Sequence, residues 1–398
     1  MKTKRKQITN NFLLYFILIF CFEPKLFVKY KFLNWTYIVG LLFAFCLICF
    51  IYLKEKTPIP MMFYWVVLFR VSFMLQTFLA KGDVTMWGYF TIVLFTLCLT
   101  SSYYIKKDCN FFLNALINVL TVILTINLII TFIYPNGIID ELYFIGIRTR
   151  CTDLIFPLIV ITFVRDNLNK VKASPKSLYC LIISIATVYR LHIATAIVGL
   201  GCFVIFLGVF YFILKSLRGI KLMPILLVGA LLLSGLVVSG ILIKSFLWLI
   251  QNVLHKSATI SGRTEIWELA IEKIKEKPIF GHGMYNNGNF VYWGYTGGEK
   301  SLWQAHNQWL QLLFDGGIVT TVIFIALIIV SGNRLEKIKN KTVKTLFLAG
   351  FGAFFVMMIS EIYSYTQYFY LLIFIAYQGK NLKGKDCFED RISCNLQQ

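Results

Sequence analysis

Two short segments of this 398-residue chain carry side chains suited to phosphate binding and proton transfer. In the first, Ser261-Gly262-Arg263 immediately precedes a predicted helix. The first turn of a helix has unpaired backbone N–H groups and a partial positive charge, and an adjacent arginine adds a planar set of donors that fits phosphate oxygens. The segment therefore indicates an anion-binding site, although Ser-Gly-Arg before a helix often serves only as a cap.

The second segment, Ala305-His306-Asn307-Gln308, stands at the start of another predicted helix. The partial positive charge of a helix N-terminus disfavours an imidazolium, so we expect His306 to be neutral and able to accept a proton. A neutral histidine beside an anion site has the components for general-base activation of a hydroxyl group. The simpler interpretation is a histidine that only caps its helix.

The composition indicates where this chemistry takes place. The chain is 58% hydrophobic and only 15% charged, with a mean hydropathy of +0.72, whereas soluble domains are about half apolar. This excludes a soluble globular protein and predicts an all-α fold, a polytopic integral membrane helical bundle. The net charge of +20 would suggest nucleic-acid binding in a soluble protein. In a membrane protein it is explained by topology.

About twelve transmembrane helices are predicted, because each span takes about 20 residues. The apolar segments are 11–22, 33–53, 60–80, 84–104, 111–134, 151–164, 177–190, 193–214, 222–249, 308–330, 345–360 and 362–378. The basic start has no small-residue cleavage site after it, so we expect an uncleaved first span. With both termini in the cytoplasm, most cations fall in inward loops. Lys25, Lys29 and Lys31 are exceptions, and the count is eleven if 11–22 does not span.

The longest connection divides the chain into four parts. We expect an N-terminal transmembrane bundle over 1–250, an extracytoplasmic catalytic loop over 251–307, C-terminal spans over 308–379 and a cytoplasmic tail over 380–398. Within the loop, apolar residues at i, i+3, i+4 and i+7 predict an amphipathic helix that ends before Pro278. These residues are Trp267, Ala270, Ile271 and Ile274. We interpret this stripe as a packing face.

The ten cysteines predict neither a disulfide framework nor a metal site. Most of them lie inside apolar segments or at their ends. Cys46 and Cys49 form a CxxC pair, but they lie at lipid depth with no other ligand nearby. We interpret the pair as packing and assign no metal and no cofactor.

The motifs around the long loop resemble the signature region of the O-antigen ligase and polymerase superfamily of bacterial envelope glycosyltransferases. That pattern has a small-Gly-Arg before a Trp-containing helix, a Pro-hydrophobic-hydrophobic-Gly-x-Gly turn, His-Asn, and an acid followed by glycines in the next span. The matching residues here are Gly262-Arg263, Trp267, Pro278-Ile279-Phe280-Gly281-His282-Gly283, His306-Asn307 and Asp315-Gly316-Gly317. The family's acid is more often Glu, so Asp315 is a departure.

The resemblance implies roles for single residues. His306 matches the family's essential histidine, the proposed general base, and Arg263 matches an arginine thought to hold the pyrophosphate leaving group. Arg190 stands where a further family arginine is expected, although Tyr189 replaces the serine before it. The residues expected to bind substrate are Arg148, Arg150, Asn307, His282 and Trp267. The first two of these resemble another family arginine but lack the Pro-Asn that follows it, and headgroup anchoring is their alternative role.

The resemblance also implies an activity. We expect a metal-independent polymerase of capsular polysaccharide, exopolysaccharide or O-antigen repeat units at the outer face of a bacterial cytoplasmic membrane. It would transfer a growing glycan, with inversion, from a polyprenyl-pyrophosphate carrier to a hydroxyl of another lipid-linked repeat. The expected partners are polyprenyl-pyrophosphate-linked oligosaccharide, membrane lipid, and flippase and chain-length regulator proteins, and no nucleic acid.

Two alternative functions stay open. One is a ligase that joins finished polymer to a lipid or another acceptor, and the other is a transporter or flippase of lipid-linked oligosaccharide. Transporters often carry internal repeats around a midplane site. This sequence has no repeat between its halves, and its candidate polar groups gather at the predicted outer rim, so an enzyme is favoured.

Two further features have open interpretations. Aromatic and amide side chains of the long loop either stack on sugars or form an interfacial belt. They are Tyr285, Asn286, Asn287, Tyr292, Trp293, Tyr295 and Trp303. Arg70 lies in the middle of an apolar segment, where a charge is costly. It either guides the phosphate of the carrier or pairs with a buried acid.

Overall fold

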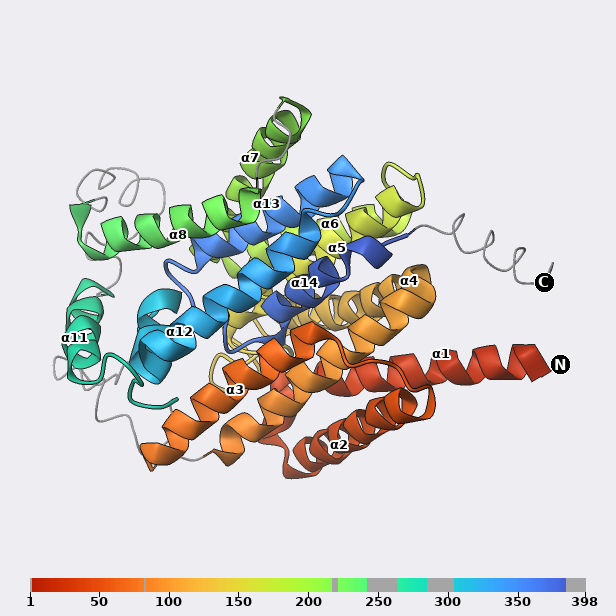
Figure 1. Cartoon of the computed structure of the whole chain (residues 1–398), viewed down its shortest axis with the longest axis horizontal. Helices are drawn as coiled ribbons and strands as arrows, with labels where there is room; N and C mark the ends of the chain where they lie inside the picture. Colours follow the sequence, from red (N-terminus) through yellow and green to blue (C-terminus); the bar gives the residue numbers. More distant parts are fainter. Residues whose placement is uncertain (1, 82–83, 217–220, 242–262, 285–303, 384–398) are drawn as a thin grey trace.

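The computed structural model describes residues 2–81, 84–216, 221–241, 263–284 and 304–383, and this part of the chain is almost wholly helical (Figure 1). The helices are α1 (Lys2–Cys21), α2 (Lys31–Lys54), α3 (Met61–Leu79), α4 (Thr85–Ile133), α5 (Ile155–Leu168), α6 (Pro175–Leu191), α7 (Ala194–Ser216), α8 (Leu222–Val238), α11 (Arg263–Glu276), α12 (Gln308–Leu335), α13 (Lys341–Met357) and α14 (Gln367–Tyr377). Short 3-10 helices are η1 (Lys25–Lys29), η2 (Arg148–Thr152) and η4 (Gly379–Asn381). In the described ranges, strand-like backbone pairing is limited to isolated bridges between residues 139 and 147.

Each predicted apolar segment overlaps a helix, although residues 242–249 of the segment 222–249 lie outside the described residues. Two of them, 84–104 and 111–134, form the single long element α4, which leaves helical geometry at Asp108 (φ −152°, ψ 92°). The Asp108 carboxylate accepts a hydrogen bond from the backbone N–H of Phe111 (2.9 Å) and so caps the second half of α4. The prediction of two consecutive helices is confirmed at this point, and the break between them falls beside Lys106 and Lys107.

Helix length and composition support a membrane protein. In the described part of the chain, five helices are long and apolar enough to cross a membrane, namely Lys31–Lys54, Met61–Leu79, Trp87–Ile133, Ala194–Ser216 and Gln308–Leu335. Shorter apolar helices are Phe12–Cys21, Leu222–Val238 and Gln367–Tyr377. The all-α membrane fold is therefore confirmed, whereas the count of twelve spans stays a prediction.

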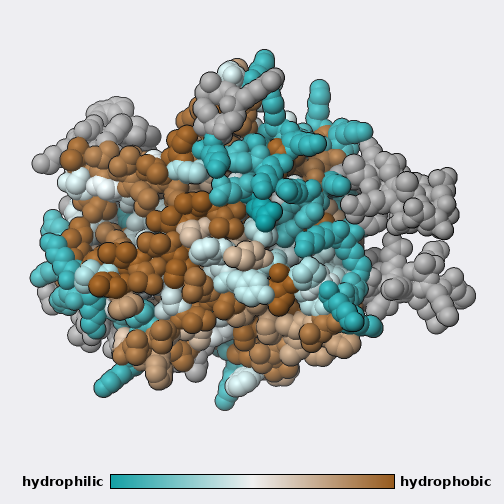
Figure 2. Space-filling model, in the orientation of Figure 1, coloured by the Kyte–Doolittle hydropathy of each residue, from teal (hydrophilic) through white to brown (hydrophobic). Residues whose placement is uncertain are grey.

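Large apolar side chains cover much of the outer surface. They come mainly from α2, α3, α7 and α8, and include Phe32, Leu53, Phe78, Val204 and Leu232. Figure 2 shows hydrophobic side chains spread over much of one face of the molecule. Apolar surface on this scale is unfavourable in water. It is the expected contact surface of a helical bundle with lipid.

The core of the bundle is formed around α14. Its residues from Gln367 to Ala376 are all buried, and α4, α12 and α13 pack against it. Phe369 and Tyr370 place their rings among those of neighbouring helices, at 5.3 Å from Phe354 and 6.2 Å from Phe69. The last α-helix among the described residues is thus the centre of the fold, which fixes the segment just before it relative to α4 and α12.

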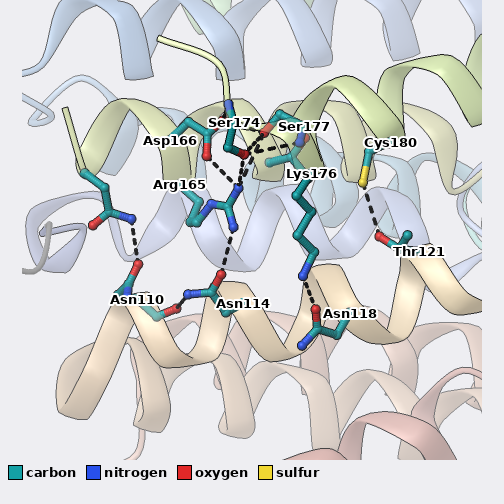
Figure 3. A network of polar contacts seen from close by, with 12 residues as sticks. Asn110, Asn114, Asn118, Thr121, Arg165, Asp166, Ser174, Lys176, Ser177 and Cys180 are labelled. Atoms are coloured by element: carbon teal, nitrogen blue, oxygen red, sulfur yellow. Dashed lines mark hydrogen bonds and ion pairs between the residues drawn. The ribbon is translucent and has the colours of Figure 1, made fainter. Parts of the chain in front are cut away.

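A polar network clamps the α5–α6 hairpin onto the second half of α4 (Figure 3). Three amides of α4 spaced one helical turn apart face the hairpin, namely Asn110, Asn114 and Asn118. Arg165 donates to Asn114 (2.9 Å) and pairs with the Asp166 carboxylate (2.5 Å). Asp166 in turn accepts hydrogen bonds from the start of α6. Because such polar contacts have little competition from water in a membrane, they hold helices together.

Helix α12 contains a break that the turn after α11 repairs. Gly317 has φ +63° and ψ −163°, so the carbonyls of the preceding turn and the N–H groups of the following turn cannot bond to each other. The turn after α11 supplies carbonyl acceptors and N–H donors in place of these missing helical partners. Four backbone hydrogen bonds join it to the break: Ile318 N to Pro278 O (2.9 Å), Val319 N to Ile279 O (3.2 Å), His282 N to Phe314 O (2.7 Å) and Gly283 N to Asp315 O (2.8 Å). Unpaired backbone groups are expensive in a membrane, so this exchange stabilises the broken helix.

We predict that Gly317→Ala destabilises the fold by about 1–3 kcal/mol. The backbone region of Gly317 is accessible almost only to glycine, and a Cβ atom there would meet the Ile279 carbonyl carbon at 2.3 Å. Thermal unfolding of the purified protein in detergent measures the effect. Gly208→Ala is the control, because no atom lies within 4 Å of a Cβ built at this helical position. Equal melting temperatures for the two variants would contradict the analysis of the break.

Candidate functional site

Helix α11 brings Arg263 to the start of α12. Its buried residues Ile266, Trp267 and Ala270 pack with Ala305, Leu310 and Phe314, which confirms the predicted packing stripe. The helix ends at Glu276, as expected before Pro278. The indole N–H of Trp267 donates to the carbonyl of Ala305 (3.0 Å). This bond fixes the backbone immediately before His306 relative to Arg263.

The start of α12 positions His306 by capping and by tertiary hydrogen bonds. The Asn307 side-chain oxygen accepts from the N–H groups of Trp309 (3.0 Å) and Leu310 (3.1 Å), so Asn307 is the N-cap of the helix. Its amide N–H group donates to the carbonyl of Ile359 (3.0 Å) and to Ser234 (2.9 Å). His306 has a φ of +47°, which turns the chain into this cap. The prediction that His306 stands at a helix start is confirmed.

The segment between α13 and α14 is held beside His306. The backbone N–H of Gln308 donates to Met358 O (2.8 Å), and the Gln308 side-chain oxygen accepts from the N–H groups of Tyr363 (2.7 Å) and Ser364 (2.8 Å). The side-chain amide also donates to the Ser364 hydroxyl (2.8 Å). One side chain therefore fixes the loop that carries Glu361.

Glu361 joins two arginines that are far apart in the sequence. Its carboxylate lies 3.3 Å from Nη2 of Arg263 and 4.0 Å from Nη2 of Arg150. Arg150 also lies 3.6 Å from the Asp153 carboxylate and donates to the carbonyl of Ile362 (2.6 Å). Glu361 and Asp153 are only 5% and 3% exposed. Buried charges require such pairing, because an uncompensated one is strongly destabilising.

The charged cluster sets the protonation state of His306. Burial lowers the pKa of His306 to about 4, Glu361 opposes this, and the positive charges of Arg263 and Arg150 add to it. The imidazole is therefore neutral at physiological pH, as predicted, but burial is the main cause rather than the helix terminus. The Nδ1 atom of His306 is buried and has no hydrogen-bond partner among the described residues. A neutral imidazole has one unprotonated ring nitrogen, which can accept a proton.

Arg148 and Arg190 occupy a separate pocket of about 310 Å³ on the other side of η2. Arg148 donates to the carbonyls of Leu191 and His192, which end α6. The guanidinium of Arg190 lies 5.4 Å from the centre of the Phe132 ring, and its buried Nε has no partner within the described ranges. The structure thus divides the predicted arginines into two groups, with Arg150 and Arg263 in the cluster of His306.

His282 lies in the turn that repairs α12. Its Nε2 atom is 2.8 Å from the carbonyl of Lys273, and its ring stacks on Phe314 at 4.8 Å. Trp267 and Asn307 likewise form hydrogen bonds inside the protein. These three residues hold the site together, and substrate binding by them stays a prediction. Ser261, Gly262 and the aromatic and amide residues between 285 and 303 lie outside the described residues.

Arg70 is completely buried between α3 and α4. Its Nε donates to the hydroxyl of Thr91 (3.0 Å) and its Nη2 to the carbonyl of Trp87 (3.4 Å). The guanidinium also lies over the rings of Phe73 and Phe90, at 5.7 and 5.1 Å. Its partners are thus a hydroxyl, a carbonyl and two aromatic faces, which is a structural environment for the charge.

The comparison with protein families agrees with the motifs at this site. Residues 179–325 match the family model described as O-Antigen ligase. This segment of the chain is therefore similar to the O-antigen ligase family. A comparison with curated proteins gives no match. The ligase-like segment runs from α6 into α12 and contains Arg190, Arg263 and His306, whereas Arg150 and Glu361 come from outside it.

Sequence reasoning missed Glu361 and Asp153. Glu361 lies between two predicted apolar segments, 345–360 and 362–378, and Asp153 lies at the start of another. Acidic residues in such places are rare and usually functional, so this was the available signal. Glu361 pairs with Arg263, 98 positions away, and Asp153 pairs with Arg150, three positions away. These pairings follow only from the tertiary structure. In the described part of the chain no group of three or more His, Cys, Asp or Glu side chains could hold a metal ion.

We predict that His306 titrates near pH 4 rather than near its ordinary pKa of 6.5. Glu361→Gln lowers this pKa further, because it removes the carboxylate that favours the imidazolium while both arginines remain. NMR of protein labelled with ¹⁵N only in histidine measures the titration, since the chain has four histidines. The signal missing in His306→Gln gives the assignment.

Glu272→Gln is the matched control, because this glutamate is exposed on α11. In this variant, the titration of His306 should follow that of the wild type. A midpoint near 6.5, or a rise of the midpoint in Glu361→Gln, would contradict the electrostatic account of the site.

Proposed function

We propose that the protein is a polysaccharide polymerase that transfers a glycan from a polyprenyl-pyrophosphate carrier to a sugar hydroxyl of another carrier-linked repeat unit. The observation that carries the proposal is the cluster of neutral His306 with Arg263 and Arg150 around Glu361. A base and fixed cations are the two components that glycosyl transfer from a pyrophosphate requires. The similarity of residues 179–325 to the O-antigen ligase family supports the same reaction class.

The arginines act on the leaving group. Cleavage of the bond between the anomeric carbon and the phosphate oxygen leaves the electron pair on the pyrophosphate. Guanidinium groups held in place before the reaction stabilise this growing charge without reorganisation. Arg263 is suited to this role, because the Glu361 carboxylate lies 3.3 Å from its Nη2 atom and orients the guanidinium. Arg190 and Arg148, which line their own pocket, are assigned to the phosphates of the carrier or to lipid headgroups.

His306 acts on the acceptor. Its neutral ring takes the proton of the acceptor hydroxyl while the hydroxyl oxygen forms a bond to the anomeric carbon. Attack occurs opposite the leaving pyrophosphate, so a single displacement inverts the anomeric configuration. The neutral imidazole of His306 supports this assignment, because one of its two ring nitrogens carries a lone pair that can take the proton.

The orientation in the membrane follows from the positions of the charges. We assign the site to the outer face of a bacterial cytoplasmic membrane, with both termini inside. The start of α1 lies at the end of the molecule opposite to α11 (Figure 1). The lysines and arginines of 165–176, 334–344 and the residues before 11 belong to predicted inward segments, which supports this orientation by the positive-inside rule.

We predict that His306→Ala and Arg263→Ala each reduce polymerisation about 100-fold or more. The assay uses purified protein in nanodiscs, extracted polyprenyl-pyrophosphate-linked repeat units, and EDTA. The glycolipid products are separated on a gel. The wild type and Glu272→Gln should give a ladder, whereas the two site variants should leave single repeats.

The other outcomes of this assay separate the alternatives. A wild type that gives no ladder but transfers preformed polymer to an added acceptor is a ligase. A wild type that does neither with verified substrate points to a transporter, and full activity of the site variants would overturn the assignment of the site. A transport defect would also leave the lipid-linked substrate on the inner face, whereas an enzyme defect leaves it on the outer face.

A further inference from the structure

A second pocket shares Arg150 with the charged cluster. It has a volume of about 290 Å³ and lies between the segment before α2, the loop before η2 and the start of α14. We call it the Glu23 pocket. The side chains used in the argument are Glu23, Lys25, Arg150, Asp153, Tyr365 and Thr366. The volume is at the lower end of small-molecule sites, about 300–1,000 Å³, which suits a sugar ring or two.

The charges of the Glu23 pocket balance. Two carboxylates, Glu23 and Asp153, face two cations, Lys25 and Arg150. By contrast, the pocket of Arg148 and Arg190 has two arginines and one glutamate. A phosphate is therefore attracted to the pocket of Arg148 and Arg190 rather than to the Glu23 pocket. Carboxylates next to tyrosine, threonine and glutamine side chains instead offer hydrogen bonds of both kinds to an uncharged polyhydroxylated molecule.

Glu23 has an unsatisfied oxygen. Glu23 is only 5% exposed, and its Oε1 atom has no hydrogen-bond partner among the residues that the structure describes. The neighbouring Tyr89 hydroxyl, which acts on the pKa of the Glu23 carboxyl, is also buried and without a partner among the described residues. A buried carboxylate oxygen without a donor is costly. A hydroxyl group of a bound ligand would supply the missing donor.

Two routes connect the Glu23 pocket to His306. Arg150 lines the pocket and reaches Glu361 in the cluster (4.0 Å). On the other route, the hydroxyl of Tyr365 donates to Asp315. Asp315 accepts from the side-chain amide of Gln311 (2.9 Å), whose oxygen accepts from the backbone N–H of Ala305 (2.7 Å), the residue before His306. The pocket is therefore linked to the surroundings of His306 through Arg150 and through this chain of hydrogen bonds.

We propose that the Glu23 pocket binds an uncharged sugar residue of the acceptor glycan. The inference rests on the proposed transferase function and adds the place of the acceptor to it. Glu23 accepts a hydrogen bond from a sugar hydroxyl, Thr366 supplies a further polar contact, and Arg150 marks the wall shared with the leaving-group site. The acceptor thus approaches from the side of η1 and α14, while the anionic carrier lies on the side of Arg263.

The test measures binding and turnover with the same acceptor. The probe is the free repeat-unit oligosaccharide, released from its carrier by mild acid. Its binding to the full-length protein in nanodiscs is followed by saturation-transfer NMR, and its KM as an acceptor by product analysis. Glu23→Gln should weaken binding and raise this KM about tenfold or more, because a charge-assisted hydrogen bond is lost, with little change in kcat. Inhibition by inorganic pyrophosphate should stay unchanged.

Thr366→Val provides a second variant that keeps the size of the side chain, and Glu272→Gln is the control. Each variant is first compared with the wild type in elution profile and melting temperature. Unchanged oligosaccharide affinity in both folded pocket variants, or displacement of the oligosaccharide by pyrophosphate, would overturn the proposal. Because the NMR measurement needs no turnover, it tests the pocket even if the wild type forms no ladder, so failure of the transferase function is seen separately.

Discussion

The ion pairs of the buried Glu361 carboxylate determine the arrangement of the site. It lies between Arg263, at the start of α11, and Arg150, in η2. Without it, Arg263 would lose the carboxylate that it contacts and Arg150 would keep only Asp153, which is unfavourable in a largely buried environment. The carboxylate therefore holds two cations near the neutral His306, and the proposed mechanism uses this arrangement. Such preorganisation is the property that favours a transition state over a ground state.

The helices around the site serve this arrangement in different ways. Asn307 and Gln308 join the start of α12 to the segment that carries Glu361. The turn with Pro278 and His282 replaces the backbone partners that α12 loses at Gly317. A continuous helix would keep its own hydrogen bonds and would leave this turn without a place to bind. The glycines of both segments are needed because backbone atoms approach each other closely there.

The sequence predicted the local features of the fold well. Apolar segments predicted the helices, the spacing from Trp267 to Ile274 predicted α11 and its packing face, and the segment with His306 predicted a helix start, whereas the role of Asn307 as the cap of α12 came from the structure. The tertiary pairings were beyond such reasoning. Nothing in local periodicity brings Glu361 to Arg263 or separates Arg148 from Arg150, which are two residues apart. Their directions depend on a single 3-10 turn, η2, which packs against α6.

The polar network between α4 and the α5–α6 hairpin has a consequence for the spacing of Arg150 and Arg190. Arg150 precedes α5 and Arg190 ends α6, so both cations lie at the open end of a hairpin whose closed end is fixed by Arg165, Asp166 and the asparagines of α4. The hairpin thus sets the distance between the two arginines. A ligand that touches both arginines meets a separation set by helix packing, and any tilt of the hairpin displaces the two charges together.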